Sequence, residues 1–219
     1  MTAKHKGAVF GKRHLLALGV TALFVTGCGG SIVGPGSAPQ LYLLRPTLSA
    51  AEGPKVAWAL NIAPPDATNN LDTQRIALFN PPARMDYYAN ASWPDRLPAL
   101  VQSAVAQAFE QSGRISAVAP DDAGLRSDYA LQIALRDFNA IYASPNAIPS
   151  FRIHMTVKLV RTRTRSIVQT LDVVQDVPAG ANTVDAVVSA ANQALGAALK
   201  QIVDWTLTAP PLPPPAPAS

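Results

Sequence analysis

Cysteine and histidine are scarce in this chain of 219 residues, which holds one cysteine and three histidines. A single cysteine excludes a disulfide within the chain, so no disulfide framework holds the fold together. The same counts exclude a metal site built from several cysteines and histidines. His5 and His14 lie close to the N-terminus, which leaves His154 for the body of the protein. No readable motif supplies a nucleophile near His154, so we expect a surface imidazole and no enzyme.

The apolar run at residues 15–28 is too short for a transmembrane helix, which needs about 20 apolar residues. No acidic residue precedes this run. Four basic residues do precede it, namely Lys4, Lys6, Lys12 and Arg13. A basic segment, a short apolar segment and small residues at the cleavage point are typical of a secretory signal peptide. We therefore predict that residues 1–27 are removed as a signal peptide.

A cysteine stands where a plain signal peptide would end in a small residue. The segment Val25-Thr26-Gly27-Cys28 resembles a bacterial lipobox, in which Leu or Val, then Ser, Thr or Ala, then Gly or Ala precede the cysteine. The resemblance implies that Cys28 carries a diacylglyceryl group on its thiol and a fatty acyl chain, such as palmitate, on its new amine. Such an anchor is stable, because each buried CH₂ contributes about 0.8 kcal/mol. The alternative is an ordinary cysteine within a plain signal peptide or a transmembrane anchor.

Residues 28–40 join this cysteine to the body of the protein. Their Gly, Pro and Ser content is typical of a flexible tether. Fully extended, the dozen residues after Cys28 reach at most about 40 Å, so the body would stay close to its membrane. Gly29 occupies the position where an aspartate retains enterobacterial lipoproteins at the inner membrane. Its presence favours the periplasmic face of the outer membrane, with the inner membrane as the alternative.

The excess of basic over acidic residues in the whole chain comes from residues 1–27 and not from the body. The chain has 18 Lys and Arg against 14 Asp and Glu, and four of the basic residues lie in residues 1–27. Because 18 minus 4 is 14, the mature chain is formally neutral. A neutral body gives no global support for nucleic-acid binding, and we expect no nucleic-acid partner.

Period-two patterns predict short strands in the first part of the body, at residues 41–44, 56–62, 74–79 and 85–89. An apolar stripe at helical spacing predicts a helix between residues 93 and 111 that begins near Leu97, because Pro94 and Pro98 are tolerated only in or before the first turn. Gly113 is the expected end of this helix, and residues 115–119 form a further short strand.

The second part of the body alternates more clearly. Residues 129–135 predict a strand, and the apolar phase changes beyond Asp137, as a β-bulge would produce. Residues 151–160 and 166–174 predict a hairpin. Residues 183–205 predict the last helix, with Asn182 as its N-cap and Asp185 in its first turn. We expect one α/β domain, residues 41–208, in which a mixed β-sheet packs against two helices as an α/β sandwich, followed by a Pro-rich tail, residues 209–219.

Four residues in a polar, Pro-rich setting are candidates for partner binding, namely Arg84, Tyr87, Tyr88 and Trp93. Tyrosine, tryptophan and arginine are the residue types that interfaces favour. The alternative is that these residues cap the edge of the core.

Three arginines at the predicted hairpin turn, Arg161, Arg163 and Arg165, are candidates for binding an anionic ligand. Guanidinium groups bind phosphates and carboxylates through paired hydrogen bonds. The alternative is a turn whose charges are only solvated.

Several segments of the body resemble one known family when taken in order. They are Tyr42-Leu43-Leu44 after the lipobox, residues 71–113 with an Arg-Ile strand, a Tyr-Tyr-x-x-x-x-Trp segment and a following helix, Ser127-Asp128-Tyr129-x-Leu131, and Val177-Pro178. Together they are similar to the ABC-type transport auxiliary lipoprotein family, which includes the paraquat-inducible lipoprotein C. The resemblance spans the body from residue 41 to about residue 207.

The resemblance implies an α/β sandwich with no catalytic residues and no cofactor. It also implies a partner, a mammalian-cell-entry (MCE) domain protein with its ABC permease and ATPase, which moves lipid between the inner and outer membranes. Only the lipidated Cys28 can be carried over as a functional residue. We therefore expect a non-enzymatic periplasmic tether. The alternatives are a periplasmic carrier of lipid or another small ligand and an envelope scaffold.

Overall fold

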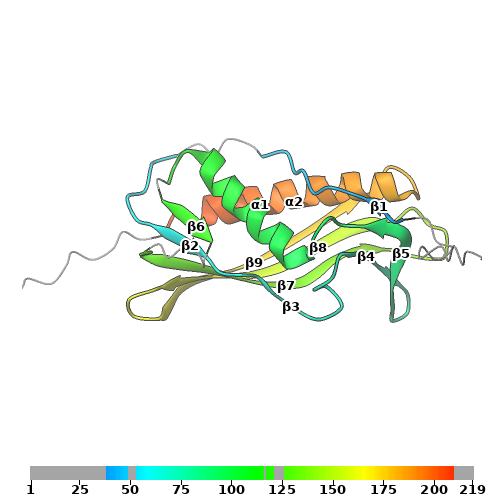
Figure 1. Cartoon of the computed structure of the whole chain (residues 1–219), viewed down its shortest axis with the longest axis horizontal. Coiled ribbons are helices and arrows are strands. Elements are labelled where there is room, and N and C mark those ends of the chain that lie inside the picture. The colour runs from blue at the N-terminus through cyan, green and yellow to red at the C-terminus, as the bar shows by residue number, and fades with distance from the viewer. Residues whose placement is uncertain (1–37, 49–52, 116, 121–125, 210–219) are drawn as a thin grey trace, which may run out of the picture. The chain divides into compact units, whose positions relative to one another are not determined.

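A computed structural model of the chain describes residues 38–48, 53–115, 117–120 and 126–209. The predicted signal peptide, most of the tether and the tail beyond Ala209 lie outside these residues. The described residues form a mixed sheet of nine strands and two helices, which confirms the predicted α/β class (Figure 1).

The sheet is organised around β7, Tyr129–Ile141. On one side of β7 three short strands follow one another along its length, and all run parallel to it: β2, Leu60–Ile62; β3, Asp66–Ala67; and β4, Arg75–Asn80. On its other side β8, Ser150–Arg161, pairs antiparallel along the whole strand. One long strand therefore holds together elements from both halves of the sequence.

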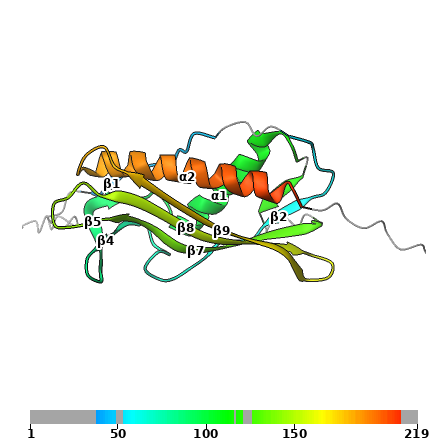
Figure 2. The same ribbon diagram turned by 180° about the vertical axis from the view of Figure 1, so that it is seen from behind.

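Four further strands extend the sheet outward from these. β6, Val118–Pro120, pairs with β2, and β5, Arg84–Ser92, pairs with β4. β1, Gln40–Leu41, adds a parallel pair to β5. β9, Ser166–Pro178, pairs with β8 and completes the predicted hairpin. The turn of this hairpin lies at one end of the sheet, and β1 and β5 lie toward the other (Figures 1 and 2).

Alternation along β7 and β8 decides which face of the sheet is buried. Tyr129, Leu131, Ile133 and Leu135 are buried, while Gln132 and Arg136, at alternate positions, are exposed. The register of β7 against β8 shifts between Leu135 and Asp137, which confirms the predicted bulge. In β8 five alternate residues, Phe151, Ile153, Met155, Val157 and Leu159, are at most 1% exposed.

Both helices lie on the same face of the sheet (Figures 1 and 2). α1, Leu97–Ser112, begins where predicted and ends at Gly113, whose φ of 62° is the left-handed conformation that glycine adopts readily. α2, Val184–Thr206, packs along β8 and β9. The space between the helices and the sheet is filled by buried side chains, including edge-to-face pairs of Phe138 with Trp93 and with Phe151.

The predicted N-cap of α2 was wrong. Thr183 caps the helix, because its Oγ1 accepts a hydrogen bond from the Ala186 N–H at 3.3 Å. The Oδ1 of Asn182 instead accepts the hydroxyl of Tyr142 at 2.8 Å. The side chain of Asn182, which the local sequence favours as a cap, therefore forms a tertiary hydrogen bond with Tyr142 and does not cap the helix.

The first predicted strands were too long. Of the predicted strand at residues 41–44 only Leu41 lies in a strand of the sheet, in β1. Of the predicted strand at residues 56–62 only Leu60–Ile62 does so, in β2, and Val56 forms an isolated bridge with Ile115. Residues 42–48, which we call the strap, cross α2 instead. The side-chain amide of Asn192 in α2 forms two hydrogen bonds with the strap. Its Oδ1 accepts a hydrogen bond from the Arg45 N–H at 2.6 Å, and its Nδ2 donates to the Leu43 carbonyl at 3.4 Å.

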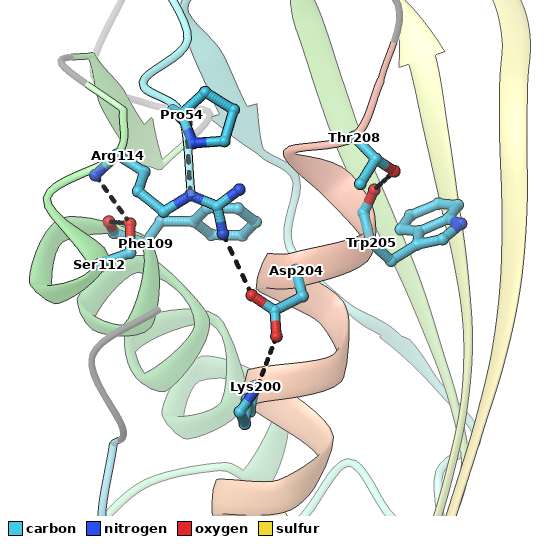
Figure 3. A network of polar contacts seen from close by, with 8 residues as sticks. All are labelled: Pro54, Phe109, Ser112, Arg114, Lys200, Asp204, Trp205 and Thr208. Atoms are coloured by element: carbon cyan, nitrogen blue, oxygen red, sulfur yellow. Dashed lines mark hydrogen bonds and ion pairs between the residues drawn. The ribbon is translucent and has the colours of Figure 1, made fainter. Parts of the chain in front are cut away.

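An ion-pair network fastens the end of α1 to α2 (Figure 3). The side chain of Arg114 is 8% exposed, and its Nη1 lies 3.1 Å from Oδ1 of Asp204. Nζ of Lys200 lies 2.6 Å from the other oxygen of Asp204. The Arg114 Nε–H also donates to the carbonyl of Pro54 at 3.4 Å. The network therefore also fixes the chain that leads into β2.

Candidate functional site

The predicted aromatic cluster is not one exposed patch. Trp93 is 1% exposed and packs in the core, so its ring is not accessible to a partner. Tyr87 and Tyr88 are neighbours in β5 and therefore point to opposite sides of the strand. Arg84 is exposed at the start of β5.

Tyr88 takes part in a partly buried chain of hydrogen bonds. Its hydroxyl lies 2.8 Å from the hydroxyl of Tyr142, which in turn donates to Oδ1 of Asn182 at 2.8 Å. Because Tyr142 uses its proton on Asn182, Tyr88 donates to Tyr142. Burial, followed by this hydrogen bond, raises the pKa of Tyr88 above its ordinary value. The chain links β5 to the segments after β7 and before α2.

Tyr87 is engaged on the other side of β5. Its hydroxyl donates to the carbonyl of Asn70 at 3.0 Å. The guanidinium of Arg75 lies over its ring, 3.9 Å from the centroid, within the range of a cation–π contact. Both tyrosine hydroxyls therefore form hydrogen bonds that link β5 to neighbouring segments of the protein. Arg84 is the exposed member of the predicted set.

The predicted arginines of the hairpin turn lie beside a hollow. The hollow has a volume of about 620 Å³ at the end of the sheet where β8 meets β9. Its lining consists of Arg126, Ser127, Asp128, Arg161, Thr162, Arg163 and Thr164. The structure thus brings Arg161 and Arg163 together with Arg126. Arg165 does not line the hollow; it has a φ of 53° in the turn.

Thr162 joins the two sides of this hollow. Its N–H donates to the carbonyl of Asp128 at 3.0 Å, and its Oγ1 donates to the carbonyls of Ser127 and Asp128. These bonds hold the turn of the hairpin against the segment that leads into β7. A hollow lined by three guanidinium groups can bind an anion.

Sequence reasoning missed Arg126. Nothing local marks it, because it is brought to the turn by the pairing of Tyr129 with Arg161 in the sheet. The predicted strand near residue 129 and the predicted turn near residue 161 were the information from which the position of Arg126 could have been inferred. An antiparallel register between those two elements would have aligned Arg126 with the turn.

The face of the sheet away from the helices carries paired charges. Arg152 Nε lies 2.8 Å from Asp176 Oδ1 across β8 and β9. His154 Nε2 lies 3.0 Å from Oδ1 of Asp172, and this hydrogen bond holds the pKa of Asp172 below its ordinary value. His154 is thus half-buried in a charge ladder on the strand where it was predicted to face outward.

No group of three or more His, Cys, Asp or Glu side chains within the described ranges is arranged to hold a metal ion. Two further hollows lie outside the helix–sheet layer. One, of about 710 Å³, lies along α2 beside the strap at Thr47, and one of about 360 Å³ lies on the open face beside β3. Among the helices that the structure describes, none has the length and apolar character needed to cross a membrane.

Comparisons with known proteins agree with this architecture. A model of the family described as "ABC-type transport auxiliary lipoprotein component" matches residues 42–203. The fold is similar to a crystal structure of a Xanthomonas campestris protein of the family DUF330, with 29% identity and a TM-score of 0.73 over 77% of this chain and 95% of that one. A crystal structure of an uncharacterized protein is similar in fold alone, with 13% identity and a TM-score of 0.62 over 78% of this chain and 99% of that one. No curated protein matches the chain in sequence.

Proposed function

The chain belongs to the ABC-type transport auxiliary lipoprotein family, and from this membership we propose that it is the non-enzymatic, membrane-anchored component of an ABC transport system. The observation that carries the proposal is the family match over residues 42–203, which covers nearly the whole folded body. The body itself begins at Gln40, so a short segment separates it from Cys28.

The anchor in this proposal is the acylated Cys28. The lipobox sequence and the family description both support a lipidated cysteine. The tether of residues 28–40 reaches at most about 40 Å from the membrane surface. We place the body at the periplasmic face of the outer membrane, since Gly29 is not the aspartate of inner-membrane retention. The inner membrane is the alternative.

The partner in this proposal is an MCE-domain protein with its ABC permease and ATPase. This system would move lipid between the inner and outer membranes, and the ATPase would supply the energy. The body would hold the periplasmic end of the assembly in register with its membrane. In support, the layer between helices and sheet is filled with side chains such as Leu131, Ile153 and Leu195, which are fully buried. Lipid would therefore travel through the partner and not through this chain.

The same packing weighs against the alternative of a lipid carrier with a pocket between helix and sheet. Three hollows of the described body lie at its periphery, at the hairpin turn, beside the strap and on the open face. Native mass spectrometry of delipidated protein would distinguish the two functions. A carrier would retain a co-purified lipid, whereas a tether would not. An envelope scaffold would be recognised by cell-wall enzymes that co-purify with it.

The proposal is tested by affinity purification of the full-length, acylated protein from crosslinked cell envelopes. We expect an MCE-domain protein, a permease and an ATPase to co-purify. Recovery of cell-wall enzymes alone would overturn the transport role and favour a scaffold.

The anchor is tested separately with Cys28→Ala and with Ser37→Ala as a control in the same tether. We expect Cys28→Ala to give a folded protein that leaves the membrane fraction, and Ser37→Ala to stay in it. A Cys28→Ala protein that remains membrane-bound and functional would overturn the lipid anchor.

A further inference from the structure

We propose that the hollow at the β8–β9 turn is a binding site for a phosphate-bearing anion, held by Arg126, Arg161 and Arg163. The site goes beyond the transport role, because it concerns a ligand of this chain and not its partner assembly. Its volume of about 620 Å³ falls in the range of small-molecule sites, roughly 300–1,000 Å³.

Among the described residues, the three arginines of the hollow form no ion pair, in contrast to three other arginines of the body. Arg96, Arg114 and Arg152 each form an ion pair with an aspartate. Within the described ranges no carboxylate oxygen lies within 4 Å of a guanidinium nitrogen of the hollow's arginines. Their hydrogen-bond donors are therefore available to an anion from outside the chain.

Arg161 is the most constrained of the three. Its guanidinium lies over the ring of Tyr129, 5.9 Å from the centroid, and that ring packs edge-to-face against Trp58 at 5.0 Å. Its Nε–H is buried and has no hydrogen-bond partner within the part of the chain that the structure describes. A buried donor without an acceptor is unfavourable, so a shift of this side chain that brings its Nε–H to an anion oxygen in the hollow would be favourable.

The backbone around the hollow fixes the spacing of these charges. Thr162 ties the turn to Ser127 and Asp128 through three donated hydrogen bonds. Arg161 and Arg163 therefore line the hollow from the hairpin side, and Arg126 lines it from the segment that leads into β7. Guanidinium groups from two segments can donate to different oxygens of one phosphate.

Asp128 also lines the hollow, and its carboxylate would oppose an anion. Its Oδ2 accepts the backbone N–H of Ala59 at 2.9 Å, which holds the side chain toward β2. Three arginines against one aspartate leave a formal lining charge of +2, since 3 minus 1 is 2. The lining thus favours a phosphate monoester or diester over a neutral ligand. The phosphate can be free or part of a lipid headgroup.

The experiment is a calorimetric titration of the full-length acylated protein in detergent, at low ionic strength. The probes are inorganic phosphate, glycerol 3-phosphate, dihexanoyl phosphatidylglycerol below its micellar concentration, and acetate. We expect at least one of the three phosphate probes to bind with one site per chain, and acetate to bind at least tenfold more weakly. Tighter binding of the lipid than of both free phosphates identifies a headgroup, and the reverse order identifies a free phosphate.

The variants are Arg161→Gln and Arg126→Gln, with Arg165→Gln as the control of equal charge in the same turn outside the hollow. We expect each of the first two to lower phosphate affinity at least tenfold and the control to change it less than twofold. Thermal melts check the folding of each variant, and the exposed Arg126 keeps the test valid if Arg161→Gln unfolds. Absence of phosphate binding, equal binding of acetate, or an equal loss in Arg165→Gln would each overturn the proposal.

Discussion

The hydroxyl of Tyr88 donates to the hydroxyl of Tyr142 over 2.8 Å, and this pair ties β5 to the segment that follows β7. Tyr142 holds the more demanding position, because it accepts from Tyr88 and donates to Asn182. In this chain of hydrogen bonds Tyr142 therefore has two partners and Tyr88 has one.

We expect Tyr142→Phe to lower the free energy of unfolding by about 1–3 kcal/mol, since it removes the acceptor of the half-buried Tyr88 hydroxyl and the hydrogen bond to Asn182. Tyr88→Phe should cost about 0.5–1.5 kcal/mol, because Tyr142 keeps its bond to Asn182. Urea denaturation of both variants and of the double variant measures the difference. Equal losses in the two single variants would contradict this order.

The same pair predicts a loss of stability at alkaline pH. The pKa of Tyr88 is raised in the folded protein above its ordinary value of about 10. A raised pKa means that the protonated form is favoured by folding. Its contribution is complete below pH 10 and is lost as the pH rises from there toward the folded-state pKa. Urea melts between pH 8 and pH 11 should show a steeper alkaline decline in the wild type than in Tyr88→Phe, and parallel declines would refute the assignment.

Gly196 of α2 lies directly beneath the strap, where an added Cβ would be 2.8 Å from the carbonyl oxygen of Thr47. In an exposed helix Gly→Ala stabilises by about 1 kcal/mol, but here the methyl group meets backbone. We expect Gly196→Ala to lower stability by about 1–3 kcal/mol and to displace the strap.

Hydrogen exchange at Arg45, whose N–H donates to Asn192, reports this displacement and should become faster. Gly180→Ala is the control, because an added Cβ there meets nothing within 4 Å. A more stable Gly196→Ala protein with unchanged exchange at Arg45 would show that the strap does not rest on this glycine.

Asp204→Asn removes the partner of a buried guanidinium, since the Arg114 side chain is 8% exposed. An uncompensated buried charge costs up to about 3–5 kcal/mol, and the half-exposed Asp204 should reduce this to about 1–3 kcal/mol. Asp72→Asn is the matched control, because it breaks the surface pair with Arg96. Surface pairs contribute little, so the control should change the denaturation midpoint far less. Similar shifts in both variants would argue against a special role for the buried pair.

The charge ladder on the open face predicts a response at acid pH. The hydrogen bond from His154 is the main cause of the lowered pKa of Asp172, and Thr156 contributes less. A lowered carboxyl pKa stabilises the fold above the ordinary value of about 3.9, and this contribution is lost as the pH falls through the lowered pKa.

Carboxyl NMR should therefore place the titration of Asp172 below that value in the wild type. His154→Gln should raise the pKa of Asp172 toward its ordinary value, and Thr156→Val should raise it by a smaller amount. A larger rise in Thr156→Val would reverse the assigned causes.

The long elements could be predicted from the sequence because their periodicity spans many residues. β7, β8, β9 and both helices each repeat an apolar pattern over at least 12 residues, and their bounds lie close to the predicted ones. The bulge near Asp137 was also readable, because the apolar phase changes there.

The short elements could not be predicted in the same way. β3 has two residues and was not predicted, and β2 has three of the seven residues expected. The extent of these strands is set by backbone pairing with β7, which the pattern of apolar residues along a short segment does not show. The strap is apolar because it packs on α2, and its pattern was therefore mistaken for that of a strand.

The candidate sites followed the same rule. Arg161 and Arg163 were found from a local run of arginines, whereas Arg126 needed the register of β7 with β8. The polar neighbours of Trp93 made it a candidate for partner binding, but its ring lies in the core between β5 and α1 in the chain. Asn182 lost the cap position to Thr183 because of Tyr142, which is distant in sequence.

The central position of β7 also sets an order of assembly. β2, β3 and β4 precede β7 in the chain, and Leu60 pairs with Tyr129 and Ala77 with Asn139. A chain that emerges N-terminus first therefore lacks the pairing of these three strands with β7 until β7 has followed, although β2 can already pair with β6 and β4 with β5. The β7–β8–β9 meander closes through short turns, and we expect it to form early and to receive the earlier strands. A delay of this kind leaves strand edges unpaired for longer, and unpaired edges favour chaperone binding and aggregation.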